Sequence, residues 1–286
     1  MLALQLLLNG IVTGCALGVV AVSFALIYAT TKIFHVAHAG VYTLGGYIAW
    51  SLVVRGVPDL IALLLAMAVC MALGALIQHQ LYGRLERRGA THLGILIASL
   101  GALAVIQNII AAVYSANILQ FPSAWAARTF GIGGLRLSAA QFATLGISLA
   151  AFAAVLWFAR ATIMGKRIRA VASNPFLAEI TRLEPRTVHV YVVAIASAVV
   201  CLPGVLVPFD LGLQPYGGIT PLLTATIAMI AGGVGSLTGA FALSIVIVVL
   251  QNLSLLVMPG EWSIGVTFFI FVIFMLFRPR GLFANA

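Results

Sequence analysis

Residues 5–29 read QLLLNGIVTGCALGVVAVSFALIYA, a run of 25 residues without a charged side chain. A helix needs about 20 predominantly apolar residues to cross the hydrocarbon core of a bilayer. Because no water is present there to bond exposed backbone groups, a run of this kind is expected to be helical. Residues 5–29 therefore predict a membrane-spanning helix.

The same pattern fills the rest of the chain, which is 63% hydrophobic and 7% charged over 286 residues. Further apolar runs lie at 34–54, 60–82, 92–113, 139–160, 189–208, 219–235, 237–257 and 262–277. The alternation typical of a membrane β-barrel is absent. We expect one all-α integral membrane domain over 1–286, a bundle of about 8–9 transmembrane or re-entrant helices with discontinuous segments. The run at 219–235 is short and ends in glycines, so a re-entrant segment stays open as an alternative there.

Small residues in these runs predict close helix packing. Gly10, Gly14 and Gly18 repeat every four residues, so they share one helix face on which a neighbouring helix can approach. The three cysteines, which are odd in number, also lie inside apolar runs and are interpreted as packing residues. No cleaved signal peptide is expected, because no basic residue precedes the first apolar run.

The basic residues predict the orientation. If the N-terminus lies outside, the loops on the inner side hold Lys32, Arg84, Arg87, Arg88, Arg160, Lys166, Arg167, Arg169, Arg182, Arg186, Arg278 and Arg280. The opposite loops hold only Arg55, Arg128 and Arg136. This bias follows the positive-inside rule, so we expect the N-terminus outside, the C-terminus in the cytoplasm and 161–188 as a cytoplasmic loop. A net charge of +9 spread over short loops also argues against nucleic-acid binding.

The expected cytoplasmic loop contains the longest cationic segment of the sequence. Residues 165–175 read GKRIRAVASNP between two long apolar runs. In a chain with almost no soluble mass, a loop of this kind is a candidate docking surface for a partner. The Asn174-Pro175 pair is compatible with a helix cap, since proline is accepted at a first helical position.

Glycines and polar residues in 37–47 predict a broken helix beside a path. Gly40, Gly45 and Gly46 interrupt an apolar run that also carries His38, Tyr42 and Thr43, and broken helices at membrane depth are tolerated where they line a cavity. His35 and His38 have the spacing of two metal ligands, but no third ligand follows, so hydrogen-bonded histidines at a helix start are the favoured interpretation. Polar residues inside other runs are interpreted either as interhelical hydrogen-bond partners or as a water-lined path: Asn9, Gln107, Asn108, Gln251 and Asn252.

The stretch GGVGSLTG at 232–239 is superficially like a phosphate-binding loop. It lacks the lysine that reaches the phosphates, so we predict a tight turn or helix break, and ATP, if used, binds to another chain. A Ser236–His189 protease pair is disfavoured, because no further catalytic signature accompanies it. No apolar run has an acidic or basic residue at its centre, which disfavours an ion-coupled carrier and favours a neutral or zwitterionic solute.

Three stretches together resemble the permeases of branched-chain amino acid ABC transporters. They are VAHAGVYTLGGY at 36–47, GKRIRAVASNPFLA at 165–178 and GGVGSLTG at 232–239, in the order found in that family. The chain departs from the family pattern at Ala39, at Arg182-Leu183 and at Pro175. The proline leaves two alternatives for the coupling helix: either it runs from Pro175 to about Leu183, or 166–172 is helical and a kink follows.

The resemblance implies a permease subunit in the bacterial inner membrane that forms half of an importer's path. Its solute would be a branched-chain amino acid, urea or an amide-like molecule. Its partners would be a second homologous permease, two cytoplasmic ATPases, a periplasmic binding protein and membrane lipid, with no nucleic acid, no cofactor and no catalytic site of its own. The alternative is a passive channel, which needs no docking loop.

The resemblance assigns His38, Gly40, Tyr42 and Gly45 to the path and Arg169, Ala170, Asn174 and Ala178 to coupling, and the residue patterns above add the other candidates. The full set for the substrate path is His38, Gly40, Tyr42, Thr43, Gly45, Gly46, Asn108, Gly232 and Gly233. The full set for ATPase coupling is Gly165, Lys166, Arg169, Ala170, Asn174, Pro175 and Ala178.

Overall fold

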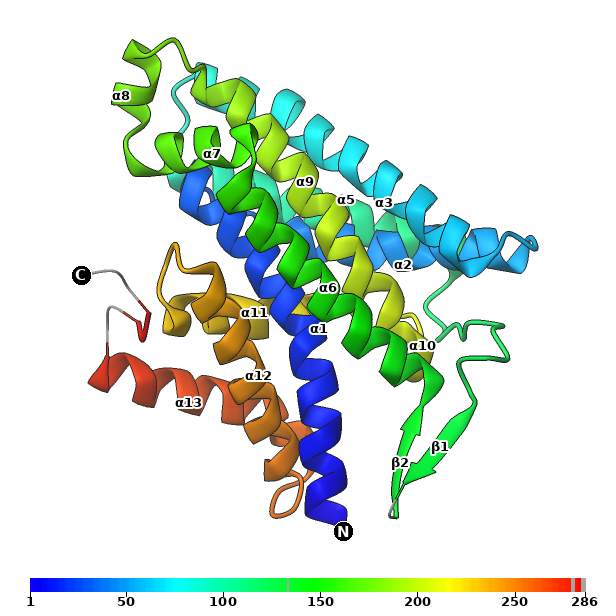
Figure 1. Cartoon of the computed structure of the whole chain (residues 1–286). Helices are drawn as coiled ribbons and strands as arrows, with labels where there is room; N and C mark the ends of the chain where they lie inside the picture. The colour runs from blue at the N-terminus through cyan, green and yellow to red at the C-terminus, as the bar shows by residue number, and fades with distance from the viewer. Residues whose placement is uncertain (133, 279–280, 284–286) are drawn as a thin grey trace.

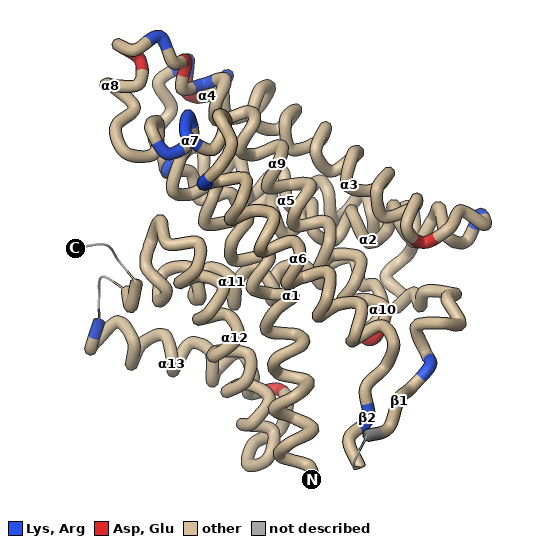
Figure 2. Tube along the Cα trace, viewed as in Figure 1, with Lys and Arg blue, Asp and Glu red and all other residues tan. Residues whose placement is uncertain are grey.

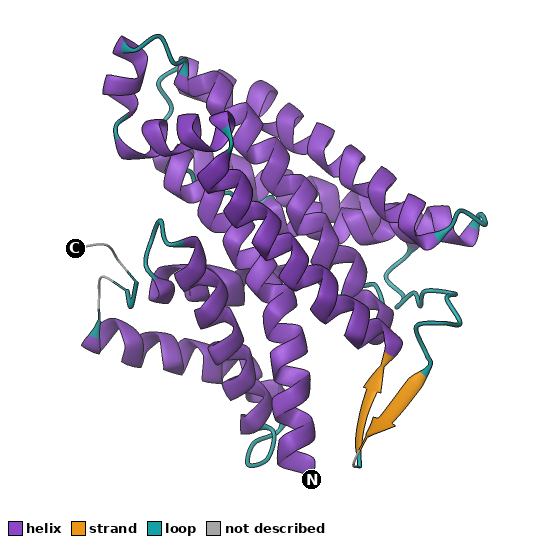
Figure 3. Ribbon diagram, in the orientation of Figure 1, coloured by secondary structure: helices purple, strands orange, loops and turns teal. Residues whose placement is uncertain are grey.

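A computed structural model describes residues 1–132, 134–278 and 281–283. Within these ranges the regular secondary structure is helical apart from one short hairpin (Figure 3). The long helices are α1 (Leu2–Thr31), α2 (His38–Val54), α3 (Asp59–Leu76), α5 (His92–Tyr114), α6 (Ala139–Ala161), α9 (Pro185–Leu206), α11 (Ile219–Gly232), α12 (Leu237–Ser254) and α13 (Ser263–Phe277). The short elements are η1 (Ile77–Tyr82), α4 (Gly83–Arg87), β1 (Thr129–Ile132), β2 (Leu135–Ser138), α7 (Ile163–Ser173), α8 (Pro175–Ile180), α10 (Pro208–Leu211) and η2 (Gly260–Trp262).

Each predicted apolar run coincides with a helix, so the all-α membrane fold is confirmed. Among the described residues, seven helices are long and apolar enough to cross a membrane. The short run is different, because α11 has 14 residues and reaches only about 21 Å at 1.5 Å per residue. That length is less than the roughly 30 Å of a bilayer core, so α11 is a buried half-helix.

Helix α1 forms the centre of the bundle (Figure 1). It contacts α12, α9, α11 and α6, and its glycines explain how they approach. A Cβ added to Gly10 or Gly14 would lie 2.8 Å from the Cα of Val249 or Ile245 on α12, and one added to Gly18 would meet the ring of Phe241. The predicted packing face on α1 is therefore confirmed as the seam with α12.

The break before α2 is earlier than the sequence predicted. Helix α2 is continuous from His38 to Val54, and its glycines lie inside it. The chain instead leaves helical geometry at residues 32–37, after Lys32 takes the left-handed conformation with φ 57°. These residues fold back along α1, because His38 bonds to Ser23, eight positions before the end of α1. At 1.5 Å per residue α2 thus starts roughly 12 Å inside the end of α1.

The charges separate between two ends of the molecule (Figure 2). The end that carries α4, α7 and α8, which we call the cationic end, holds most of the described basic residues. The opposite end, which we call the hairpin end, carries the N-terminus, the α2–α3 turn and the β1–β2 hairpin. Of the twelve basic residues counted for the inner loops, Arg280 lies outside the described residues.

The hairpin is held at the start of α6 and beside α3. β1 and β2 pair antiparallel from Thr129↔Ser138 to Ile132↔Leu135. Ser138 then begins α6 with a capping box, in which its hydroxyl accepts from the Gln141 N–H. In the loop before β1, Trp125 and Ser123 both donate to the Asp59 carboxylate at the start of α3.

Candidate translocation path and docking surface

A cavity of about 350 Å³ lies between α1, α2, α9–α10, the start of α11 and the α12–α13 corner. That volume is within the range of small-molecule sites. Its polar lining consists of hydroxyl and amide side chains: Thr13, Tyr42, Thr43, Gln214, Thr220, Thr224, Gln251 and Ser263. Among the described residues, none that lines it is Asp, Glu, Lys, Arg or His. The cavity can therefore offer hydrogen bonds and apolar contact to a solute without a fixed ionic partner.

The connection from α10 to α11 forms the deep wall of this cavity. Gly212, with φ 79°, turns the chain inward, and Leu213 exchanges two backbone hydrogen bonds with Leu119. Gly218 then packs directly against the carbonyl of Ala39, where any side chain would collide. Consequently α11 starts beside α2 inside the bundle and runs towards the cationic end (Figure 1).

The first turn of α11 lies at the cavity and carries a backbone N–H group that is free to donate. Thr220 lines the cavity and lies in the first turn, where backbone N–H groups have no intrahelical acceptor. The positive end of the helix dipole points the same way. Together with the uncharged walls, this geometry suits a neutral or zwitterionic molecule.

The predicted path residues on α2 have different surroundings. Tyr42 and Thr43 line the cavity. The α2 glycines lie in helix contacts instead: a Cβ on Gly45 would lie 2.6 Å from Cys201 Sγ, and one on Gly40 would lie 3.2 Å from Ile106. Gly46 similarly meets the carbonyl of Gly204. That these glycines also belong to the substrate path stays a prediction.

Two predicted path residues lie at other places. His38 is fully buried behind the cavity, where its Nε2 is 2.9 Å from Ser23 Oγ. Asn108 lies on the exposed face of α5, and its amide donates to the Ala104 carbonyl one turn earlier.

His35, in the folded-back segment 32–37, belongs to a series of hydrogen bonds. His35 Nδ1 is 2.7 Å from the Tyr82 hydroxyl, which donates to Ser99 Oγ at 2.7 Å. Ser99 in turn accepts the Ala37 N–H at 3.0 Å. His38 is the first residue of α2, so the predicted hydrogen-bonded histidine at a helix start is confirmed. These hydrogen bonds anchor residues 32–37 to α5 and η1.

The predicted coupling loop contains two helices at a sharp corner. α7 includes 166–172, and Asn174 (φ −153°, ψ 101°) ends it and caps α8 by accepting the Leu177 N–H at 3.1 Å. Both sequence alternatives are therefore partly right: 166–172 is helical, and Asn174-Pro175 starts a second helix. That second helix stops at Ile180 rather than Leu183, because Arg182 turns left-handed with φ 61°.

The corner exposes residues that the sequence did not single out. On α8, Phe176, Leu177 and Ile180 are 70%, 56% and 64% exposed. Ala178, which was predicted to face a partner, is instead 4% exposed and packs against Ile168 and Val188 within this chain. Its small size therefore serves the attachment of α8 to α7 and α9.

The other predicted coupling residues divide by face of α7. Gly165 is buried, because it lies directly against the carbonyls of Phe158 and Ala159 at the end of α6. Lys166, Arg169 and Ala170 are exposed. A contact between these residues and an ATPase stays a prediction.

Comparison with known proteins identifies the family. A family described as "Branched-chain amino acid transport system / permease component" matches residues 6–275. The chain belongs to this family. It is 25% identical to the high-affinity branched-chain amino acid transport system permease protein LivH of Escherichia coli (strain K12), over 98% of this chain and 94% of that one. LivH of Salmonella typhimurium has the same identity and coverage, and BraD of Pseudomonas aeruginosa is 24% identical over 98% and 95%.

A solved structure supports the fold of this family member. PsaBC from Streptococcus pneumoniae, in complex with Fab, matches with a TM-score of 0.53 at 16% identity and covers 95% of this chain and 91% of that one. At this identity the likeness concerns the fold alone.

The third motif of the family member forms the α11–α12 turn. Gly232 ends α11 and packs directly against Gly239 in the first turn of α12, while Gly233 takes a positive φ of 103°. Ser236 caps α12 by accepting the Gly239 N–H at 3.1 Å. The predicted tight turn is confirmed, and neither Gly232 nor Gly233 lines the cavity of about 350 Å³.

Proposed function

We propose that the chain is the permease subunit of an ATP-driven importer for a small neutral or zwitterionic solute, a branched-chain amino acid first of all. Two cytoplasmic ATPases, a second permease and a solute-binding protein outside the membrane would complete the transporter. The family of the chain and its similarity to the branched-chain amino acid permeases LivH and BraD support this proposal. The chain itself would carry out no covalent chemistry.

The exposed apolar face of α8 carries the coupling part of the proposal. Phe176, Leu177 and Ile180 are exposed on α8, and α8 lies at the cationic end with cationic α7 beside it (Figure 2). Apolar groups exposed together outside the bilayer usually mark an interaction site. The sequence has no phosphate-binding motif with its lysine, so energy from ATP has to arrive through a contact of this kind.

The uneven distribution of basic residues between the two ends also suggests how the chain is oriented in the membrane. We propose, from the positive-inside rule, that the cationic end lies in the cytoplasm and the hairpin end outside. The cavity at the α12–α13 corner would then receive solute from the hairpin end, and the N-terminus would lie outside. A bacterial inner membrane is the proposed location.

The lining of the cavity supports the solute class. Hydroxyl and amide groups with no ionic side chain suit an amino acid whose two charges balance. The N-terminal end of α11, at Thr220, can donate hydrogen bonds to the carboxylate of that amino acid. Urea and amide-like solutes also fit this lining. Uptake of labelled leucine, competed by isoleucine, valine, urea and acetamide, separates the two solute groups.

The coupling test uses the exposed residues of α8. We expect the double variant Phe176→Ala/Ile180→Ala to lose ATPase co-purification and solute-stimulated ATP hydrolysis, because two exposed anchors are truncated. Phe130→Ala is the matched control, since Phe130 is 52% exposed but lies on β1 at the hairpin end.

The same measurements also distinguish an ATP-driven importer from a passive channel. Wild-type ATPase binding and ATP-dependent uptake in the double variant would refute the α8 contact. Uptake by the wild type at the same rate without ATP would instead favour a channel.

A further inference from the structure

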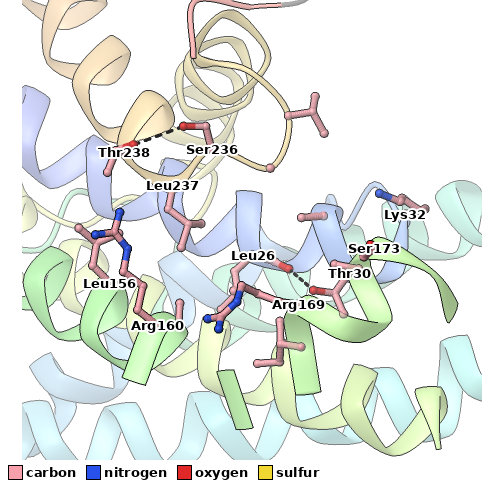
Figure 4. Close-up of a pocket in the computed structure, with 16 residues that line it drawn as sticks. Leu26, Thr30, Lys32, Leu156, Arg160, Arg169, Ser173, Ser236, Leu237 and Thr238 are labelled. Carbon is pink, nitrogen blue, oxygen red and sulfur yellow. Dashed lines mark hydrogen bonds between the residues drawn. The ribbon is translucent and has the colours of Figure 1, made fainter. Parts of the chain in front are cut away.

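A second and larger hollow, of about 620 Å³, opens at the cationic end. Its floor is the end of α1, one wall is the end of α6 with α7, and the opposite wall is the α11–α12 turn. Figure 4 shows Leu26 and Thr30 on the floor, Arg160 and Arg169 on one wall, and Ser236 and Thr238 on the other. We call this hollow the cationic groove.

The cationic groove collects positive charge without a counter-charge. Lys32, Arg160 and Arg169 line it, and all three are exposed. The six acidic residues of the chain all lie among the described residues, and none of them lines the groove. Like charges that share one hollow repel each other, so an anion bound between them relieves the repulsion.

The wall opposite the arginines adds hydrogen-bond donors. α12 has 18 residues, and Ser236, Leu237 and Thr238 at its start line the groove. Ser236 caps the N–H of Gly239, and the Ser236 carbonyl accepts that of Ala240. The N–H groups of Leu237 and Thr238 have no intrahelical acceptor, and the Thr238 hydroxyl lies beside them. Guanidinium groups facing a helix N-terminus form an arrangement suited to phosphate oxygens.

The groove also lies where a membrane surface is expected. α6 is long and apolar enough to cross a membrane and ends at Ala161, one residue beyond Arg160. Trp157, one turn earlier, is 67% exposed, and exposed tryptophans are enriched at the boundary between lipid and water. Towards the bundle interior, the stacked rings of Phe152 and Phe241, with centroids 3.9 Å apart, join α6 to α12. The groove therefore opens at headgroup depth and is closed below it.

We propose that the cationic groove binds the phosphate group of an anionic membrane lipid. Arg160 and Arg169 would contact the phosphate oxygens from one side and the α12 N-terminus from the other, while Lys32 supplies further positive potential. Apolar side chains that line the same hollow, among them Leu26, Leu156 and Leu237, suit the glycerol and upper acyl region of a lipid better than a free phosphate ion.

The test measures lipid binding by the purified full-length chain, in the absence of ATPases and solute. Phosphatidylglycerol is titrated into detergent micelles, and thermal unfolding is followed. We expect a saturable rise in Tm with phosphatidylglycerol and none with phosphatidylcholine. Arg160→Gln should raise the half-saturating lipid fraction about fivefold, from the loss of one cation near the surface, while Arg160→Lys should largely retain binding.

The control is Arg84→Gln, which removes the same charge from α4 at the same end but outside the groove. Equal losses in Arg84→Gln and Arg160→Gln would overturn the site and leave only general attraction to anionic lipid. An equal, saturable Tm rise with inorganic phosphate would assign the groove to a soluble anion. An unchanged lipid response in Arg160→Gln, with lost ATPase co-purification, would assign it to the ATPase. Because the lipid assay contains no transport component, its failure leaves the proposed importer function untouched.

Discussion

Helix α1 and the segment Gly260–Phe277, which joins η2 to α13, are both apolar and long enough to cross a membrane, yet they have opposite surroundings. The most apolar stretch of α1 is 89% buried within the chain, and that of α13 is 6% buried. α1 carries Gly10, Gly14 and Gly18 at the seam with α12, whereas α13 is rich in phenylalanine and exposes Phe269 at 66%. Hydropathy thus identifies a membrane helix, and small side chains decide which helix lies at the centre.

The strongest test of this comparison exchanges glycine for leucine in both helices. Gly14→Leu should destabilise the fold by about 3 kcal/mol, the upper part of the usual cost of overpacking, because even a Cβ would lie 2.8 Å from the Ile245 backbone. Gly265→Leu should be near neutral, since a Cβ there meets only the Trp262 ring at 3.5 Å. The measurement is thermal unfolding of the detergent-solubilised protein. Equal destabilisation by the two substitutions would show that small residues do not distinguish α1 from α13.

A second test concerns the polar attachment of α13. Gln251 on α12 donates to the Thr267 hydroxyl and, at 3.3 Å, to the Ser263 carbonyl. Gln251→Leu should therefore lower stability by about 1 kcal/mol, the usual size of an interhelical hydrogen bond in a membrane. It should also increase protease cleavage of the loop between α12 and α13.

The matched control is Asn108→Leu, because the Asn108 amide bonds only within its own helix. Cleavage of the α12–α13 loop at the wild-type rate in Gln251→Leu would show that α13 is held by apolar contact alone.

The smallest expected effect is on solute handling, because α1 and α13 each supply a hydroxyl to the same cavity. Thr13 of α1 and Ser263 of α13 both line the cavity of about 350 Å³. Thr13→Val keeps the shape and removes the hydroxyl, so the half-saturating solute concentration for uptake should rise about fivefold, the value of one hydrogen bond. Ser263→Ala should act in the same direction. Unchanged uptake in both variants, with unchanged Tm, would place the solute elsewhere.

Much of the fold could be predicted from the sequence, because each helix here is an apolar run of nearly the right length. The break before α2 could not, since it depends on contacts between distant residues: His35 with Tyr82, and Ala37 with Ser99. The glycines of α2 indicated a broken helix but serve close approach to α9 and α5. Spacing alone does not distinguish these two uses of glycine.

The candidate site was harder to predict than the fold. Tyr42 and Thr43 were identified, whereas Thr13, Gln214 and Ser263 lie on three separate elements that only the tertiary fold brings together. On α8, Ala178 was assigned to coupling by the family resemblance, and the structure shows it buried within the chain. The exposure of Phe176, Leu177 and Ile180 could have been suspected, since apolar residues that follow a cationic stretch in a loop are unusual.

The anchoring of residues 32–37 has a consequence for biogenesis. The Ala37 N–H is bonded by Ser99, 62 residues later in the chain. At roughly 5–20 residues per second of synthesis, Ala37 is made about 3–12 seconds before that acceptor. During this interval the Ala37 N–H has no hydrogen-bond partner, and placing it in the hydrocarbon core would cost free energy. The first helices should therefore stay beside the insertion machinery, or in contact with water, until α5 arrives. The α1–α2 pair is then expected to enter the lipid together with α3 and α5 rather than as an independent hairpin.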